Sequence, residues 1–135
     1  MSRILVGIFM TLHGLVHLWY FTLSRGLVAF RPEMGWSGRS WLLSKRLGDK
    51  TTRTLASALY ILATIGFVVG GIGIITQQEW WYAAIIGSAV FSTVVIVLLW
   101  DGDTRLLVQK GLVGLLINAV TILALLVLGQ SPDIF

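Results

Sequence analysis

The fold is decided by a stretch of apolar sequence near the start of the chain, residues 4–23, which reads ILVGIFMTLHGLVHLWYFTL. A helix needs about 20 such residues to cross the hydrocarbon core of a bilayer. Three further apolar runs of similar length follow, at residues 54–75, 80–100 and 109–129. The sequence therefore predicts one all-α integral membrane domain over residues 1–135, a bundle of four transmembrane helices embedded in a lipid bilayer.

The composition excludes several classes of function. The chain of 135 residues is 56% hydrophobic and 12% charged, which is unusual for a soluble domain. It contains no cysteine, and this excludes disulfides, thiolate chemistry and cysteine-ligated zinc or iron–sulfur sites. The formal charge of +4 comes from Lys and Arg residues that gather in loops. We attribute this charge to membrane topology and expect no nucleic-acid partner.

The basic residues predict how the spans are oriented. Nine of the ten Lys and Arg residues lie at residues 24–53 or 101–110, and the tenth is Arg3. Positively charged loops stay on the cytoplasmic side, so the first and third connections should be cytoplasmic. We therefore predict a multi-pass protein of the cytoplasmic membrane with both termini outside. A reporter fused at Phe135 that proves to be cytoplasmic would contradict this orientation.

Within the first connection, residues 36–47 form a short amphipathic segment. Trp36, Trp41 and Leu47 alternate with basic side chains at roughly helical spacing, which is typical of a helix that lies in the membrane interface. A helical extension of the second span, with its basic residues in water, would give the same pattern. The sequence leaves both interpretations open.

Two strips of small residues indicate close packing between helices. The second span carries the GxxxG step Gly66 and Gly70, and the third span carries a small residue at every fourth position, Ala84, Ser88 and Ser92. Small side chains let membrane helices approach each other closely. We expect these strips to pack helices within one subunit, or the GxxxG face to dock on a partner in a larger membrane complex.

The chain has two histidines, His13 and His17, which lie one helical turn apart and share one face of the first span. One metal ion could bind both imidazoles. The spans contain no Asp, Glu or Cys, so a metal or haem site would need an oligomer to complete its ligand set.

Depth in the bilayer relates the histidines to other polar residues. We place each span's midpoint at the bilayer centre and use a rise of about 1.5 Å per residue. This predicts two polar layers: His13 with Asn118 and Thr64 at the midplane, and His17 with Tyr60 and Thr93 nearer the cytoplasm. Such groups can bind a ligand or pass a proton, because ionisable residues inside a membrane are costly and commonly functional. They can equally serve as hydrogen bonds between helices, and both interpretations stay open.

Four short motifs occur along the chain, HGLVHL at residues 13–18, WLLSKRLG at 41–48, WW at 80–81 and GLLIN at 114–118. With these motifs the chain resembles a group of small four-span prokaryotic membrane proteins without an established function. The first helix, with Arg3, Gly7 and His13-Gly14, is also similar to that of DoxX-like proteins, to a lesser degree. The resemblance implies the four-helix architecture and directs attention to His13, His17 and Asn118, but it implies no reaction.

The sequence favours a small binding or accessory component, with a polar site around His13, His17 and Asn118, over an enzyme. No span offers a nucleophile, a base and an acid together, which hydrolysis would require. One alternative is a redox subunit that uses the histidine pair for a metal, a haem or a quinone. Another is a purely structural subunit of a larger complex. We also expect a homo-oligomer or a membrane-protein partner.

Overall fold

The computed structural model describes residues 2–129, and within them the chain is all-helical. The long helices are α1 (Arg3–Ser24), α2 (Ser44–Ile75), α3 (Trp81–Leu99) and α4 (Val113–Leu128). A 3-10 turn, η1 (Pro32–Met34), interrupts the first connection, and a π-helical turn, η2 (Val108–Leu112), leads into α4. In this part of the chain four helices, one of them η2 with α4, are long and apolar enough to cross a membrane. The predicted four-helix architecture is confirmed.

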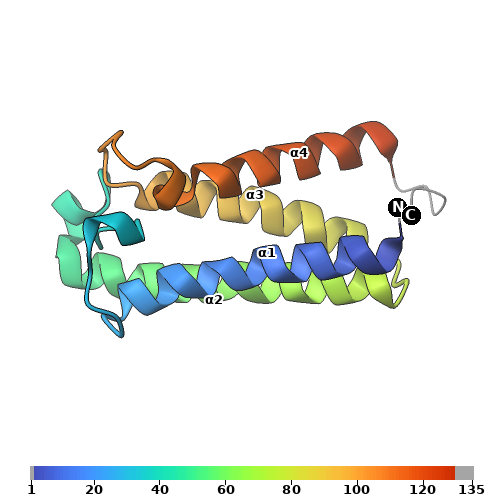
Figure 1. Ribbon diagram of the computed structural model, residues 1–135, viewed down its shortest axis with the longest axis horizontal. Helices are drawn as coiled ribbons and strands as arrows, with labels where there is room; N and C mark the ends of the chain where they lie inside the picture. Colours follow the sequence, from blue (N-terminus) through green and yellow to red (C-terminus); the bar gives the residue numbers. More distant parts are fainter. Residues whose placement is uncertain (1, 130–135) are drawn as a thin grey trace.

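The helices run side by side along the long axis of the molecule (Figure 1). The start of α1 and the finish of α4 lie at one end, which we call the terminal end. The opposite end carries residues 25–43 and 100–112, and we call it the loop end. α2 packs along both α1 and α3, and α4 packs on α3. Within residues 2–129 the backbones of α1 and α4 make no comparable approach to each other, so α4 is held mainly from one side.

Glycines bring α2 close to both of its neighbours. A Cβ atom added at Gly71 would lie 2.6 Å from the carbonyl oxygen of Gly7 on α1. A Cβ atom at Gly66 would overlap the hydroxyl of Ser88 on α3, and Gly70 lies against the same helix. The GxxxG face of α2 is therefore covered by α3 within the chain. An outside partner would have to use another surface.

The first connection closes the loop end by capping α3. The last carbonyl groups of a helix have no partner inside the helix. Here four consecutive carbonyl oxygens, of residues 97–100, each accept a hydrogen bond from residues 36–41. The donors are the indole N–H of Trp36, the hydroxyl of Ser40, and both the indole and the backbone N–H of Trp41, over distances of 2.6–2.9 Å.

The helical residues that follow this cap belong to α2. Residues 44–53 extend the spanning part of α2 toward its N-terminus, with an interruption at Gly48, whose φ of 78° is not helical. Residues 36–43 do not form an α-helix. The second half of the amphipathic segment is therefore a helical extension of the second span, which is one of the two interpretations that the sequence left open. The first half is not helical and instead caps α3.

The connection between α3 and α4 is held by ion pairs. Lys110 Nζ lies 3.0 Å from Asp101 Oδ1, and the two side chains are only 8% and 12% exposed. Asp103 pairs with the exposed Arg105 at 2.8 Å. Hydrogen bonds from the Arg105 guanidinium hold the pKa of the Asp103 carboxyl well below its usual range. Because Lys110 belongs to η2, these contacts tie the start of the connection to η2 and fold the chain back on itself.

Candidate functional site

A buried hydrogen-bonded network joins α1, α3 and α4 at the middle of the bundle. His13 Nε2 lies 2.9 Å from Oδ1 of Asn118, a residue with no exposed surface. Asn118 Nδ2 lies 3.0 Å from Ser92 Oγ and 3.2 Å from Thr93 Oγ1. His17 Nε2 lies 2.7 Å from the same Ser92 oxygen. Both histidines therefore belong to one network of side chains from three helices.

The contacts of His17 determine which atom of each pair donates. His17 Nδ1 lies 3.2 Å from the carbonyl oxygens of both His13 and Gly14. Carbonyl oxygens only accept, so Nδ1 carries the hydrogen, and Nε2 of a neutral ring must accept the hydroxyl hydrogen of Ser92. Ser92 then accepts from Asn118 Nδ2, and Asn118 Oδ1 accepts from the Nε2–H of His13.

The opposite orientation of the Asn118 amide would require a charged imidazole. If Oδ1 of Asn118 faced Ser92, the serine hydroxyl would donate to it, and His17 Nε2 would have to donate to the serine. His17 would then be an imidazolium ion inside the hydrocarbon layer, which is energetically costly. The neutral network has one solution, in which His17 is the Nδ1–H tautomer and His13 the Nε2–H tautomer.

Aromatic rings enclose the imidazoles on the α2 side. The ring of Phe67, which has no exposed surface, lies 4.8 Å from the ring of His13 and 5.7 Å from that of His17, between centroids. The ring of Tyr60 lies 6.4 Å from that of His17 and stacks on Tyr20 at 5.2 Å. α2 thus offers the two imidazoles ring surfaces and no hydrogen bond.

The two polar layers expected from depth are joined in the structure. His13 lies beside Asn118, one of the residues that the sequence predicted at its level. Thr93, expected beside His17, is instead hydrogen-bonded to Asn118. Ser92, expected only to pack helices, is the residue that contacts His17 and links the layers. Its position next to Thr93, at a depth between the two histidines, was the signal that could have identified it.

Other residues singled out from the sequence lie outside the network. The Thr64 hydroxyl donates to the carbonyl of Tyr60 at 2.9 Å, so its hydrogen bond stays within α2. Tyr60 meets His17 through its ring. The Ser88 hydroxyl donates to the carbonyl of Ala84 at 2.6 Å, and Ser88 faces α2. These residues contribute packing around the site.

A metal ion at the histidine pair would compete with the network. Across residues 2–129, Nδ1 of His13 is the one imidazole nitrogen without a hydrogen-bond partner. The same part of the chain contains no group of three or more His, Cys, Asp or Glu residues that could hold a metal. A metal bound by both rings would have to replace a hydrogen bond of His17 and take its other ligands from outside this set.

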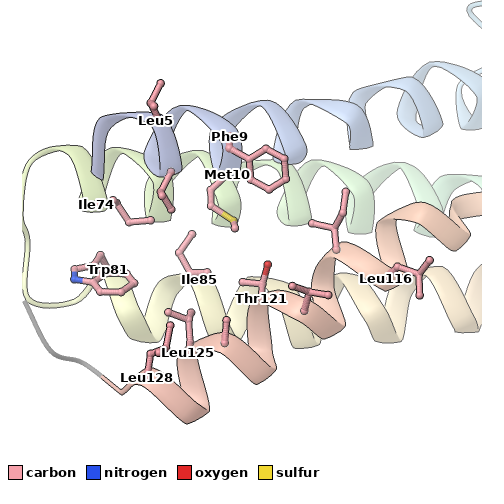
Figure 2. Close-up of a pocket in the computed structure, with 14 residues that line it drawn as sticks. Leu5, Phe9, Met10, Ile74, Trp81, Ile85, Leu116, Thr121, Leu125 and Leu128 are labelled. Atoms are coloured by element: carbon pink, nitrogen blue, oxygen red, sulfur yellow. The ribbon is translucent and has the colours of Figure 1, made fainter. Parts of the chain in front are cut away.

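An apolar cavity of about 660 Å³ lies beside the network, between the terminal-end halves of α1 and α4 (Figure 2). All four helices contribute to its lining, which includes Phe9, Met10, Ile74, Ile85 and Leu125. Small-molecule sites in proteins commonly measure about 300–1,000 Å³ and are mostly apolar. The cavity therefore has the size and the chemistry of a binding site for an apolar small molecule. No pattern in the sequence indicated it.

The network stands next to this cavity. Met10 lines the cavity three residues before His13 on α1, and Thr121 lines it three residues after Asn118 on α4. Within the described residues, the bond between His13 and Asn118 is the one side-chain hydrogen bond that connects α1 directly to α4. This bond joins the two helices that form the walls of the cavity.

The hydrogen-bonded network and the apolar cavity are the features from which a function can be inferred. The resemblance to small four-span prokaryotic proteins stays a prediction. Comparison of the chain with family models, with characterised proteins and with solved structures found no match.

Proposed function

We propose that this protein is a binding component of the cytoplasmic membrane, and that it holds an apolar, lipid-soluble molecule in the cavity between α1 and α4. The observation that carries this proposal is the cavity of about 660 Å³, with its almost entirely apolar lining. Strongly polar or charged ligands would lose their hydration there and find too few hydrogen bonds to compensate for it. An apolar ligand gains dispersion contacts with the lining that a poorly packed space otherwise lacks.

The cavity is accessible from the hydrocarbon layer. Leu5 on α1 and Leu116 and Leu128 on α4 line the cavity and are also exposed on the outer surface of the bundle. An opening between two spanning helices faces lipid, so a ligand can reach it sideways without crossing water. This favours a ligand that is dissolved in the membrane.

The histidine network has a defined part in this proposal. Its hydrogen bonds are satisfied within the chain, and they hold α4 to α1 and α3 beside the cavity. A pair of helices that is otherwise poorly packed would close on itself or separate without such a connection. His13, His17 and Asn118 therefore act as positioning residues for the walls of the site.

The positive-inside rule supports a cytoplasmic loop end. Nine of the ten basic residues belong to the segments 25–53 and 105–110 at that end, and Arg3 is at the other. The cavity would then open in the outer half of the bilayer, with both termini outside. Phe135, the site for a topology reporter, lies outside the described residues.

Retention of an apolar molecule tests the proposal. The protein is purified in mild detergent, extracted with organic solvent, and the extract is analysed by mass spectrometry against protein concentration. Ala124 lines the cavity, so Ala124→Trp should fill it and abolish retention. Ala119 is exposed on the same helix and does not line the cavity, so Ala119→Trp is the matched control and should retain the molecule.

Binding of diphenylhexatriene, a fluorescent hydrocarbon, gives a second measurement on the same samples. We expect saturable binding of this probe to the wild type and to Ala119→Trp, and none above the micelle background for Ala124→Trp. Equal binding and equal lipid content in all three proteins would refute the proposal, because the cavity would then hold only bulk lipid or detergent.

A further inference from the structure

One hydroxyl group in the lining of the cavity has no hydrogen-bond partner. Thr121 is 7% exposed, and Figure 2 shows its hydroxyl oxygen pointing from α4 into the cavity, toward the side of Met10. Among residues 2–129 nothing accepts its hydrogen. A hydroxyl that faces an apolar cavity without a partner is unfavourable, because neither water nor the protein bonds it there, so a hydrogen-bond acceptor from outside the chain would stabilise this group.

Other threonines inside the helices behave differently. The hydroxyls of Thr11, Thr64 and Thr93 each donate to the carbonyl oxygen four residues earlier, at 2.8–2.9 Å. This local bond is the usual way for a threonine to satisfy itself within a helix. Thr121 has the same option in α4 and does not use it, because its oxygen is turned into the cavity. In this orientation the hydroxyl can bond an atom of a ligand in the cavity, but not a carbonyl oxygen of its own helix.

Thr121 lies too deep in the bilayer for the ester groups of an ordinary phospholipid to accept its hydrogen bond. The spanning segment Val108–Leu128 has its midpoint at residue 118, so Thr121 lies about 5 Å from the bilayer centre at about 1.5 Å per residue. The hydrocarbon core extends about 15 Å to each side of the centre. The ester groups of a phospholipid lie at the border of that core, about 10 Å beyond Thr121. An acyl chain in the cavity would leave the hydroxyl unpaired.

We propose that the molecule held in the cavity carries a carbonyl oxygen on an otherwise hydrocarbon frame, and that this oxygen accepts a hydrogen bond from Thr121 Oγ1. This rests on the proposed function and adds the chemical class of the ligand. The hydroxyl has one hydrogen to donate, and a carbonyl is an acceptor that brings no second donor into the apolar site. The ligand class is therefore lipid-soluble ketones and related carbonyl compounds that dissolve fully in the hydrocarbon layer.

Two probes of equal length test this class, tridecane and dihexyl ketone, which differ by one carbonyl oxygen. Their dissociation constants are measured by displacement of diphenylhexatriene from the detergent-purified protein. Thr121→Val keeps the shape of the side chain and removes the hydroxyl, and it should weaken ketone binding about two- to tenfold, the range for one hydrogen bond. Tridecane binding should not change.

Two further variants control for misfolding and for any general effect of replacing a threonine by valine. Thr121→Ser keeps the hydroxyl and should restore ketone binding. Thr54→Val removes an exposed hydroxyl at the loop end and should leave both probes unaffected. The infrared stretching band of the bound ketone should lie at lower frequency in the wild type than in Thr121→Val.

The possible outcomes distinguish the two proposals. If Thr121→Val changes neither the ketone constant nor its infrared band, or changes both probes equally, the carbonyl inference is wrong while binding in the cavity stands. If diphenylhexatriene binds the wild type and neither probe displaces it, the carbonyl inference is wrong while binding in the cavity stands. If diphenylhexatriene itself shows no saturable binding to the wild type above the micelle background, the cavity does not bind apolar molecules, and the proposed function fails together with the inference.

Discussion

Replacing Asn118 by Leu should remove the three hydrogen bonds that tie α4 to α1 and α3. Asn118 donates to Ser92 and Thr93 and accepts from His13. Hydrogen bonds between membrane helices contribute about 0.6 kcal/mol each, so three contribute about 2 kcal/mol. The substitution also leaves the N–H of His13 buried without an acceptor, which costs about 1 kcal/mol or more. We expect the free energy of unfolding to fall by about 3 kcal/mol.

Unfolding in mixed micelles with a rising fraction of dodecyl sulfate, followed by circular dichroism, measures this loss. A double-mutant cycle with His13→Phe, which keeps a ring and removes the donor, isolates one bond. The free energy of unfolding of the double variant should fall by about 1 kcal/mol less than the sum of the two single losses, because the effects of substitutions within one network are not additive. Leu123→Ala changes an exposed residue of the same helix and should cost little.

The reasoning is refuted if Asn118→Leu costs no more than Leu123→Ala, or if the losses from Asn118→Leu and His13→Phe simply add. The first result would mean that the network does not hold α4 in place. The second would mean that His13 and Asn118 are not hydrogen-bonded to each other in the membrane.

Two further predictions concern the imidazoles and the helix contacts. Nitrogen NMR of labelled imidazoles should find the Nδ1–H tautomer at His17 and the Nε2–H tautomer at His13; one shared tautomer, or an imidazolium signal, would contradict the proton directions assigned above. Gly71→Ala should cost about 1–3 kcal/mol in the same unfolding assay, since its Cβ would overlap a side chain of α1, whereas Gly87→Ala faces open space and should be neutral or slightly stabilising. Equal effects of the two alanines would show that the close approach of α1 and α2 does not limit stability.

The sequence predicted what depends on length along a helix. Bilayer thickness sets the number of apolar residues in a span, so the four spans could be located from the order of the amino acids alone. Helical rise sets the depth of each residue, and this alone brought His13 and Asn118 to the same level although 105 positions separate them.

The sequence could not predict what depends on rotation about the helix axis and on tertiary contacts. Ser92 and Thr93 differ in depth by one residue, yet only Ser92 reaches His17. Thr64 shares the depth of His13 but satisfies itself on α2. The cavity exists because α1 and α4 pack on other helices more closely than on each other, and no local pattern in either helix encodes that difference.

The cap on α3 changes what that helix requires of its surroundings. α3 has 19 residues and a length of about 28 Å, slightly less than the thickness of the hydrocarbon core. A spanning helix ordinarily ends where water or headgroups can reach its last carbonyl groups. Trp36, Ser40 and Trp41 supply those hydrogen bonds from within the protein, so α3 can finish below the headgroups without leaving a carbonyl unsatisfied. At this end the chain provides its own substitute for interfacial water.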